Sequence, residues 1–542
     1  MKSIYSLSFL HMIVNIKQKG EYKMKQARQI FRDAILLTAA SLLMRTVGVA
    51  FQVAVSNRAG AEVMGLYSLM MGVYGFALTL ATSGIHLGVT RLVAQYLSYH
   101  QPDRIKGIVK TACIYAVTCG TFAAGLLLFF AKPIGAHLLS DARTVPSLRL
   151  FAISLPFISL SSVFGGYFTA VRRSYKNAGI QISEQLLKIG LTMYLFSIFF
   201  TKTTEGMLCA LVLGGVGAEI FSFLLGAILY LIDNQKRSCT QKVPPCDGKA
   251  LLQNTIPIAL TSYVRSALLA IQNALIPHGL KRSGASHAAA LISYGCIHSM
   301  ALPVVLYPAA LISSFSGLLI PTMAECHAQN RQVQIKYIVA RVWFFSMLFS
   351  IGTAGILICF SEEFGAHLYP NSDAGKYIRL LAPLIPIMYL DTATDAMLKG
   401  LGEHVYSMKI NILDALISVI LVWFLTPRYG INGYLVAIYV SELFNTVFSV
   451  TRLLSVTRVS PKLLKWVYLP LVCILAATYC ARSLFPSIQN AGKFPILPCV
   501  ITGLLYFLFL LITKTVNQEE LHWGKSLLAL KSDEPQVRET TV

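Results

Sequence analysis

The sequence predicts an all-α polytopic membrane protein with about fourteen transmembrane helices. These helices form two six-helix lobes related by a parallel internal repeat, with two extra helices near the C-terminus. Three observations predict this fold class: the composition, the spacing of apolar runs and a duplication within the chain. The 542 residues are 55% hydrophobic and 13% charged, with a mean hydropathy of +0.62. These values lie outside the range of soluble domains.

Apolar runs of about 20 residues are long enough to cross a hydrocarbon core of about 30 Å. Fourteen such runs occur, and the second and eighth are long enough to be bent or tilted. No loop between them exceeds about twenty residues, which leaves no room for a soluble catalytic domain. The runs lie near residues 31–56, 64–97, 108–130, 148–170, 181–201, 206–232, 251–276, 288–319, 335–360, 376–399, 409–426, 432–454, 463–485 and 494–515.

The formal net charge of +22 would suggest a nucleic-acid partner in a soluble protein. Its distribution gives another explanation. When loops are assigned alternately to two sides, the side holding both termini collects 30 basic residues and the other side 12. The positive-inside rule therefore predicts a multi-pass protein of the bacterial plasma membrane with both termini in the cytoplasm. We expect the lipid bilayer, and no nucleic acid, as its surroundings.

Eleven cysteines are scattered singly, without a CxxC pair or a Cys/His cluster. Neither a disulfide framework nor a metal site is indicated. Near the N-terminus, the apolar run from Ile4 to Ile16 is too short to span a membrane and lacks a cleavage motif. The basic stretch that follows Met24 is typical of the residues before a first membrane helix and favours a start of translation at Met24, in which case residues 1–23 are not translated. A short interfacial leader is the alternative.

Comparison of the chain with itself reveals a repeat. Arg45 and Gln52 recur 220 residues later as Arg265 and Gln272, and RLFAISLP at 149–156 recurs 230 residues later as RLLAPLIP. One insertion around 279–290 explains the change of offset. Because each copy holds six helices, both enter the membrane from the same side, so the repeat is parallel. The predicted units are a leader (1–23), an N-lobe (24–232), a cytoplasmic linker (233–250), a C-lobe (251–454), helices thirteen and fourteen (455–515) and a cytoplasmic tail (516–542).

Several motifs resemble one known family. They are Arg45-x-x-Gly48, Asn57-x-x-Gly60-x-Glu62-x-x-Gly65-x-Tyr67, Tyr74-x-Phe76, Thr82-x-Gly84 and Glu184-Gln185-x-x-Lys188. The chain is similar, over about residues 24–515, to polysaccharide-export proteins of the stage V sporulation protein B type. These belong to the multidrug/oligosaccharidyl-lipid/polysaccharide (MOP) flippase superfamily, together with lipid II flippases and MATE drug exporters.

This resemblance implies a monomeric, two-lobed transporter and not an enzyme. It implies alternating access that moves an undecaprenyl-diphosphate-linked saccharide, such as lipid II or another polysaccharide precursor, to the outer leaflet. Peptidoglycan or polysaccharide synthesis, and sporulation, would be the processes served. In lipid II flippases an arginine of the first helix faces the cavity, and Arg45 is the matching residue. The prediction of the same role for Arg265 depends on the internal repeat alone and not on the resemblance.

A diphosphate headgroup suits two intramembrane arginines, because guanidinium binds phosphate bidentately and keeps its charge. We therefore predict that Arg45 and Arg265 form a clamp from opposite lobes. The alternative is that each pairs with a local carboxylate or reaches the membrane rim.

Other intramembrane charges have two interpretations each. Glu184 and Lys188 are spaced i, i+4, which suits a buried ion pair or a coupling site. Asp391 and Asp395 share a helix face, so they either hold a proton or cation or lie at a solvated helix end. The same question, structural hydrogen bonding or proton transfer, applies to Glu219, Asp414 and Glu442. No cofactor is expected, and transport is expected to couple to the membrane potential, Na⁺ or H⁺.

Two other classes are weighed against this interpretation. A MATE-like cation-coupled multidrug exporter would favour a cavity rich in carboxylates, and the two arginines argue against it. A membrane glycosyltransferase or acyltransferase would need an acid/base constellation at a membrane face, and the loops offer none.

Overall fold

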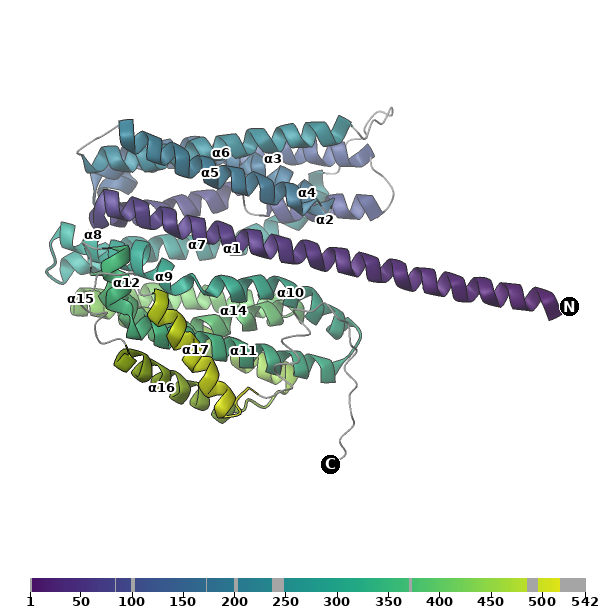
Figure 1. The fold of residues 1–542 in the computed structure, drawn as a ribbon. Coiled ribbons are helices and arrows are strands. Elements are labelled where there is room, and N and C mark those ends of the chain that lie inside the picture. Colours follow the sequence, from purple (N-terminus) through teal and green to yellow (C-terminus); the bar gives the residue numbers. More distant parts are fainter. Residues whose placement is uncertain are drawn as a thin grey trace.

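The computed structural model describes residues 2–82, 84–98, 103–171, 173–198, 203–235, 248–369, 373–484 and 496–516. Helices make up nearly all of these residues, and no β-strand occurs among them. Figure 1 shows two groups of long helices, with α1 running along the boundary between them. The predicted all-α fold is therefore confirmed.

The N-terminal group is built from two strongly apolar helix pairs and the long helix α1. α3 packs on α4, and α4 and α5 both pack on α6. α1 breaks at Gly60, whose φ of 82° and ψ of 165° suit glycine and few other residues. The elements are α1 (Lys2–Thr82), α2 (Ile85–Ser98), α3 (Asp103–Pro133), η1 (Ile134–Leu138), η2 (Ala142–Thr144), α4 (Val145–Ala170), α5 (Ser174–Ile198) and α6 (Thr204–Gln235).

The C-terminal group repeats this packing. α11 packs on α14 as α3 packs on α4, and α14 packs on α15 as α4 packs on α6. α15 is broken at Gly430, with φ 60°, into two helical halves. The elements are α7 (Gly248–Arg282), α8 (His287–Gly295), η3 (Cys296–Ala301), α9 (Leu302–Leu306), α10 (Ala309–Ala328), α11 (Gln332–Cys359), α12 (Ser361–Leu368), α13 (Ala374–Leu381), η4 (Ala382–Leu384), α14 (Ile385–Gly400) and α15 (His404–Thr457).

Two further helices pack against the outside of the C-lobe. η5 (Leu464–Tyr468), α16 (Leu469–Leu484) and α17 (Ile496–Ile512) follow α15, and α16 and α17 contact α11. Tyr506 of α17 donates a hydrogen bond to the carbonyl of Leu348 at 2.9 Å. Its ring fills the space that a Cβ on Gly352 would occupy, 2.6 Å from Tyr506 Cε1. The two extra helices are thus anchored on one lobe.

The second and eighth apolar runs are bent, as predicted. The second is interrupted between α1 and α2, where Gly84 has φ 79°. The eighth is divided among α8, the π-helical turn η3, α9 and α10. Eight helical stretches of the described residues are long and apolar enough to cross a membrane. The count of fourteen and the domain boundaries stay predictions, and 236–247 and 517–542 lie outside the described residues.

Candidate functional site at the seams between the lobes

The lobes meet along two seams, both formed by α1. At the first seam, the first half of α1 lies against the segment α8–α10. At the second seam, the second half of α1 contacts α7. Ser299 of η3 connects both halves of α1 to the C-lobe. It accepts a hydrogen bond from Gln52 on its carbonyl (2.9 Å), and its hydroxyl donates to the carbonyl of Met64 (3.0 Å). π-helical turns are often found at functional positions.

A pair of glycines lets the two lobes come close together at one end. A Cβ on Gly65 would lie 2.2 Å from the Leu291 carbonyl oxygen, and one on Gly295 would lie 2.2 Å from the Ala61 carbonyl oxygen. The two glycines are 230 residues apart, the offset of the second part of the repeat. The lobes therefore meet at equivalent positions, as a pseudo-twofold axis requires.

Arg45 lies at the first seam and reaches the opposite lobe. Its Nη2 donates a hydrogen bond to the carbonyl oxygen of Leu306 at 3.0 Å, and its side chain is exposed. Thr46 forms a 2.8 Å hydrogen bond with the hydroxyl of Tyr307. Arg45 precedes Gly60 by fifteen residues, so it lies about 22 Å along the helix from the break.

Arg265 lies at the second seam at a similar depth. It is exposed and precedes the end of α7 by seventeen residues, about 26 Å along the helix. The next residue, Ser266, hydrogen-bonds to Thr79 of α1 at 3.0 Å. The charge of Arg265 acts on Asp414 of its own lobe. Each arginine thus precedes a hydroxyl residue that bonds to the other lobe, whereas the clamp formed by the two arginines stays a prediction.

The N-lobe charges form a polar cluster around Tyr74, in the second half of α1. Tyr74 lies 3.1 Å from both carboxylate oxygens of Glu219 and 2.8 Å from the hydroxyl of Ser154. Lys188 acts electrostatically on both Glu184 and Glu219. One lysine therefore serves two carboxylates, which favours the structural interpretation of these residues.

The C-lobe carboxylates divide into two kinds. Asp395 pairs with Lys399 (Nζ to Oδ2, 2.5 Å) and accepts a hydrogen bond from Ser407. Asp391 instead accepts from Asn445 at 3.0 Å, and its Oδ1 is buried without a hydrogen-bond partner. The predicted like-charged pair is thus relieved at Asp395 by its own i, i+4 lysine.

Asp391 belongs to a second group, with Asp414 and Glu442 of α15. Ser441 donates a 2.5 Å hydrogen bond to Asp414, and Glu442 interacts electrostatically with both aspartates. We call Asp391, Asp414 and Glu442 the C-lobe acidic cluster. Among the described residues, no group of three or more His, Cys, Asp or Glu side chains is arranged to hold a metal ion.

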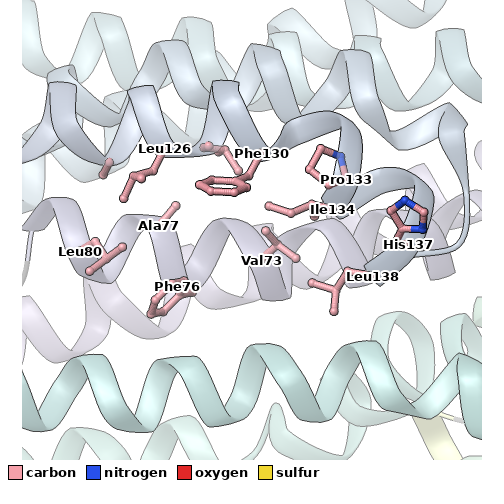
Figure 2. A pocket seen from close by; sticks show the side chains of 12 residues that line it. Val73, Phe76, Ala77, Leu80, Leu126, Phe130, Pro133, Ile134, His137 and Leu138 are labelled. Atoms are coloured by element: carbon pink, nitrogen blue, oxygen red, sulfur yellow. The ribbon is translucent and has the colours of Figure 1, made fainter.

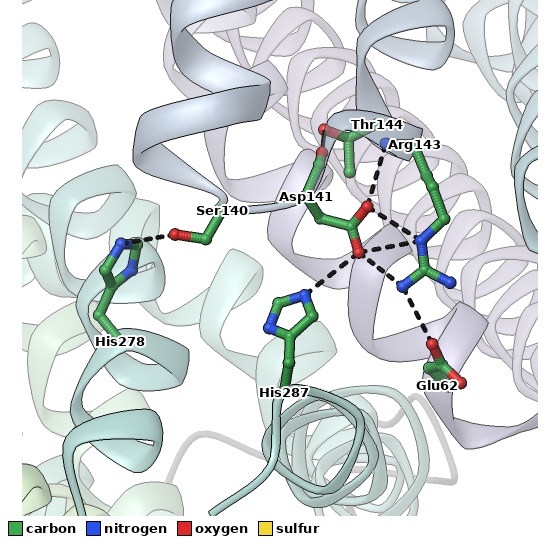
Figure 3. A network of polar contacts seen from close by, with 7 residues as sticks. All are labelled: Glu62, Ser140, Asp141, Arg143, Thr144, His278 and His287. Carbon is green, nitrogen blue, oxygen red and sulfur yellow. Dashed lines mark hydrogen bonds and ion pairs between the residues drawn. The ribbon is translucent and has the colours of Figure 1, made fainter.

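Two features were missed from the sequence. The first is an apolar cavity of about 550 Å³ between the second half of α1 and α3, which ends at His137 (Figure 2). The second is a polar network near Gly60 that joins Glu62, Asp141, Arg143 and His287 (Figure 3). Both features depend on how segments far apart in the sequence pack together, which leaves no periodic signal in the sequence.

These features define a class: a two-lobed, polytopic helical transporter, with charged residues placed at the seams and inside each lobe. The family model of polysaccharide biosynthesis proteins matches residues 30–327, and the MatE model matches residues 296–424. The chain therefore belongs to the polysaccharide biosynthesis protein family, within the MOP superfamily. The expected transporter, not an enzyme, is confirmed.

Two curated relatives come from Bacillus subtilis (strain 168). Stage V sporulation protein B is 22% identical over 91% of this chain and 98% of its own length. Lipid II flippase MurJ is 20% identical over 72% of this chain and 76% of its own length.

Solved structures share the fold. A lipid II flippase MurJ in an inward closed conformation matches with a TM-score of 0.69 and 13% identity, over 88% of this chain and 98% of that one. An inward-facing MATE family multidrug transporter of the MOP superfamily matches with a TM-score of 0.61 and 12% identity, over 79% of this chain and 99% of that one.

Proposed function

We propose that the chain flips an undecaprenyl-diphosphate-linked saccharide from the inner to the outer leaflet by alternating access. The observation that carries this proposal is the position of Arg45, a permanent cation whose hydrogen bond crosses the seam between two lobes. The family match and the similarity to proteins named as a lipid II flippase and a sporulation protein support it. The saccharide belongs to cell-wall or polysaccharide synthesis.

Arg45 recognises the part of the substrate that all such carriers share. A diphosphate presents several oxygens, and guanidinium offers five N–H donors in a planar fork. The Leu306 carbonyl takes one donor, which leaves others for phosphate oxygens. Arg265, at similar depth on the other seam, completes the clamp when the headgroup lies between the lobes.

The driving force follows from the sign of the substrate charge. We propose that both termini face the cytoplasm, so that the Gly60 end of the bundle faces outward. An anionic headgroup that leaves a negative interior moves downhill by about 2.3 kcal/mol per charge per 100 mV. The empty carrier then resets with its arginines, whose positive charge is offset by the carboxylates of the C-lobe acidic cluster, and a proton taken up by this cluster couples the reset to the proton gradient.

Complementation of a bacterium depleted of its lipid II flippase tests the proposal. We expect the native chain to restore growth and Arg45→Ala to fail at equal membrane abundance. Arg58→Ala is the matched control, because Arg58 is an exposed arginine on the same helix that bonds to Met193 Sδ and not to the other lobe. Rescue by Arg45→Ala would refute the role of Arg45. Failure of the native chain would refute lipid II as its substrate.

A second candidate is a MATE-like cation-coupled multidrug exporter, favoured by the MatE match over residues 296–424. This candidate requires cationic substrates held by carboxylates. Expression in a strain that lacks its drug exporters decides between the two. We expect unchanged susceptibility to cationic dyes, and protection that depends on Asp391 would favour the exporter.

A further inference from the structure

The polar network at the Gly60 end joins the two lobes through one histidine. Asp141, in the loop before η2, receives hydrogen bonds from the backbone N–H and side chain of Arg143, with Nη2 to Oδ2 at 2.6 Å. Arg143 also reaches Glu62 at 3.0 Å. These three residues belong to the N-lobe. The imidazole Nε2 of His287, the first residue of α8 in the C-lobe, lies 3.2 Å from Asp141 Oδ2 (Figure 3).

A second histidine crosses the same seam with a different partner. His278 of α7 lies 2.9 Å from the hydroxyl of Ser140 through Nε2 and 3.0 Å from the carbonyl of Ala274 through Nδ1. A neutral ring satisfies both contacts, because Nδ1–H donates to the carbonyl and Nε2 accepts from the hydroxyl. Protonation of His278 therefore adds little to the closed state.

His287 differs because its partner is an anion. With a neutral ring, the network holds two carboxylates, Glu62 and Asp141, against one guanidinium, that of Arg143. A protonated His287 balances the remaining negative charge and turns the contact with Asp141 into an ion pair. Its Nδ1 is buried without a hydrogen-bond partner, which limits the gain.

Other charged groups at this end point elsewhere. On α1 and α7, which pack against α8, Arg58 bonds to Met193 Sδ, Arg282 lies over the Trp423 ring and Lys281 is exposed. His298 of η3 hydrogen-bonds to Tyr434 at 2.5 Å, inside the C-lobe. The contact between Asp141 and His287 is thus the interlobe link in which a titratable base meets a carboxylate, among the residues described at this end.

We propose that Asp141 and His287 form a proton-responsive latch that holds the Gly60 end of the two lobes closed. The backbone contact of Gly65 and Gly295 brings the lobes together, and the latch sets how firmly this end stays shut. In the orientation proposed above, an acidic exterior holds the transporter closed to the outside. The latch rests on alternating access, a part of the proposed function.

The direction of the pH response follows from the two groups. Burial acts to raise the pKa of Asp141, but hydrogen bonds from Arg143 and His287 outweigh it, so this pKa lies below its ordinary value. The Asp141 carboxylate therefore stays ionised at pH values where a histidine ring can take up a proton. As the pH falls the latch strengthens, and it weakens only when Asp141 itself takes up a proton.

Distance measurement between the lobes tests the latch on the full chain in lipid nanodiscs. Spin labels on non-natural amino acids at Ala136 and Lys281, both exposed, report the separation and leave the native cysteines in place. Between about pH 7.5 and 5.5, we expect the ratio of closed to open populations to rise about fivefold, the difference between a neutral and a charge-assisted hydrogen bond.

Matched variants assign the response to one histidine. His287→Gln should abolish it, and His278→Gln should retain it, because Ser140 offers no charge. Asp141→Asn gives a second loss of response if His287→Gln folds poorly. A pH response that survives in His287→Gln, or its absence in the native chain, would overturn the latch. Because the readout is lobe separation, transport failure and latch failure are distinguishable.

Discussion

The two seams between the lobes are built alike but hold their arginines differently. At the first seam Thr46 bonds to Tyr307, and at the second Ser266 bonds to Thr79. Arg45 itself reaches the opposite lobe, at the carbonyl of Leu306. Arg265 is influenced by Asp414, in its own lobe.

This difference shows how a duplicated scaffold acquires one substrate path. The hydroxyl bridges next to the arginines preserve the pseudo-twofold arrangement, because the repeat relates the two helical segments joined by one bridge to the two joined by the other. The two arginines can have different roles because their guanidinium groups take no part in these bridges. We infer that Arg45 is the primary phosphate ligand and that Arg265 assists it while balancing Asp414.

The largest expected effect comes from removing the arginines. In proteoliposomes that contain a polyprenyl-diphosphate saccharide, Arg45→Ala should slow flipping about 100-fold, the loss of two charge-assisted hydrogen bonds. Arg265→Ala should slow it about 10-fold. The double variant should flip no more than about threefold slower than Arg45→Ala, because both arginines act on one diphosphate. Independent, multiplying effects would contradict the clamp.

The carboxylates should show the next largest effect, and this effect should differ between the two lobes. Asp391→Asn should slow flipping about 10-fold and remove its dependence on the coupling ion, because Asp391 belongs to a cluster rich in negative charge. Glu184→Gln should change the rate less than about threefold, since Lys188 lies near this carboxylate. Flipping is measured with and without a membrane potential and Na⁺ or proton gradients. Equal losses in both variants would count against a coupling role confined to the C-lobe.

Most of the fold was accessible from the sequence because it depends on local apolar length and on repetition. The repeat that pairs Arg45 with Arg265 at an offset of 220 also pairs Gly65 with Gly295 at its second offset of 230, and these glycines meet at the seam. Lys399 stands four residues after Asp395 in the sequence, the spacing of a helical ion pair, but this pairing was not among the interpretations made from the sequence. Such local signals are present in a sequence but are ambiguous without the depth of each helix end.

The network of Asp141 and His287 could not have been predicted in this way. The two residues are 146 positions apart, Asp141 in the loop before η2 and His287 at the start of α8, where polar side chains are ordinary for a membrane surface. They meet only because Gly65 and Gly295 let two helices approach at that end. A contact of this kind depends on the docking of two lobes, which no periodicity records.

The glycines of the two seams allow a smaller, steric test. Gly65→Ala should open the Gly60 end and lower stability by about 1–3 kcal/mol, because its Cβ would meet the Leu291 backbone. Gly72→Ala at the second seam should be milder, since the nearest atom, at 2.8 Å, belongs to the Asn273 side chain, which can move. Gly75→Ala is the control, because a Cβ added to Gly75 would have no atom within 4 Å. Thermal unfolding in detergent ranks the three, and equal destabilisation by Gly65→Ala and Gly75→Ala would exclude backbone contact as the cause.

The hydroxyl bridges give the smallest expected effect and test the equivalence of the seams directly. Thr46→Val removes the 2.8 Å hydrogen bond to Tyr307, and Ser266→Ala removes the 3.0 Å hydrogen bond to Thr79 together with a longer one, 3.3 Å, to the carbonyl of Gly75. Each should lower the free energy of unfolding by about 0.5–1.5 kcal/mol. Because Thr46 and Ser266 occupy equivalent positions in the repeat, the two losses should agree within about 0.5 kcal/mol and add in the double variant. A loss confined to Thr46→Val would mean that only the bridge at the first seam stabilises the contact between the lobes. The two lobes would then differ at the bridges as well as at the arginines.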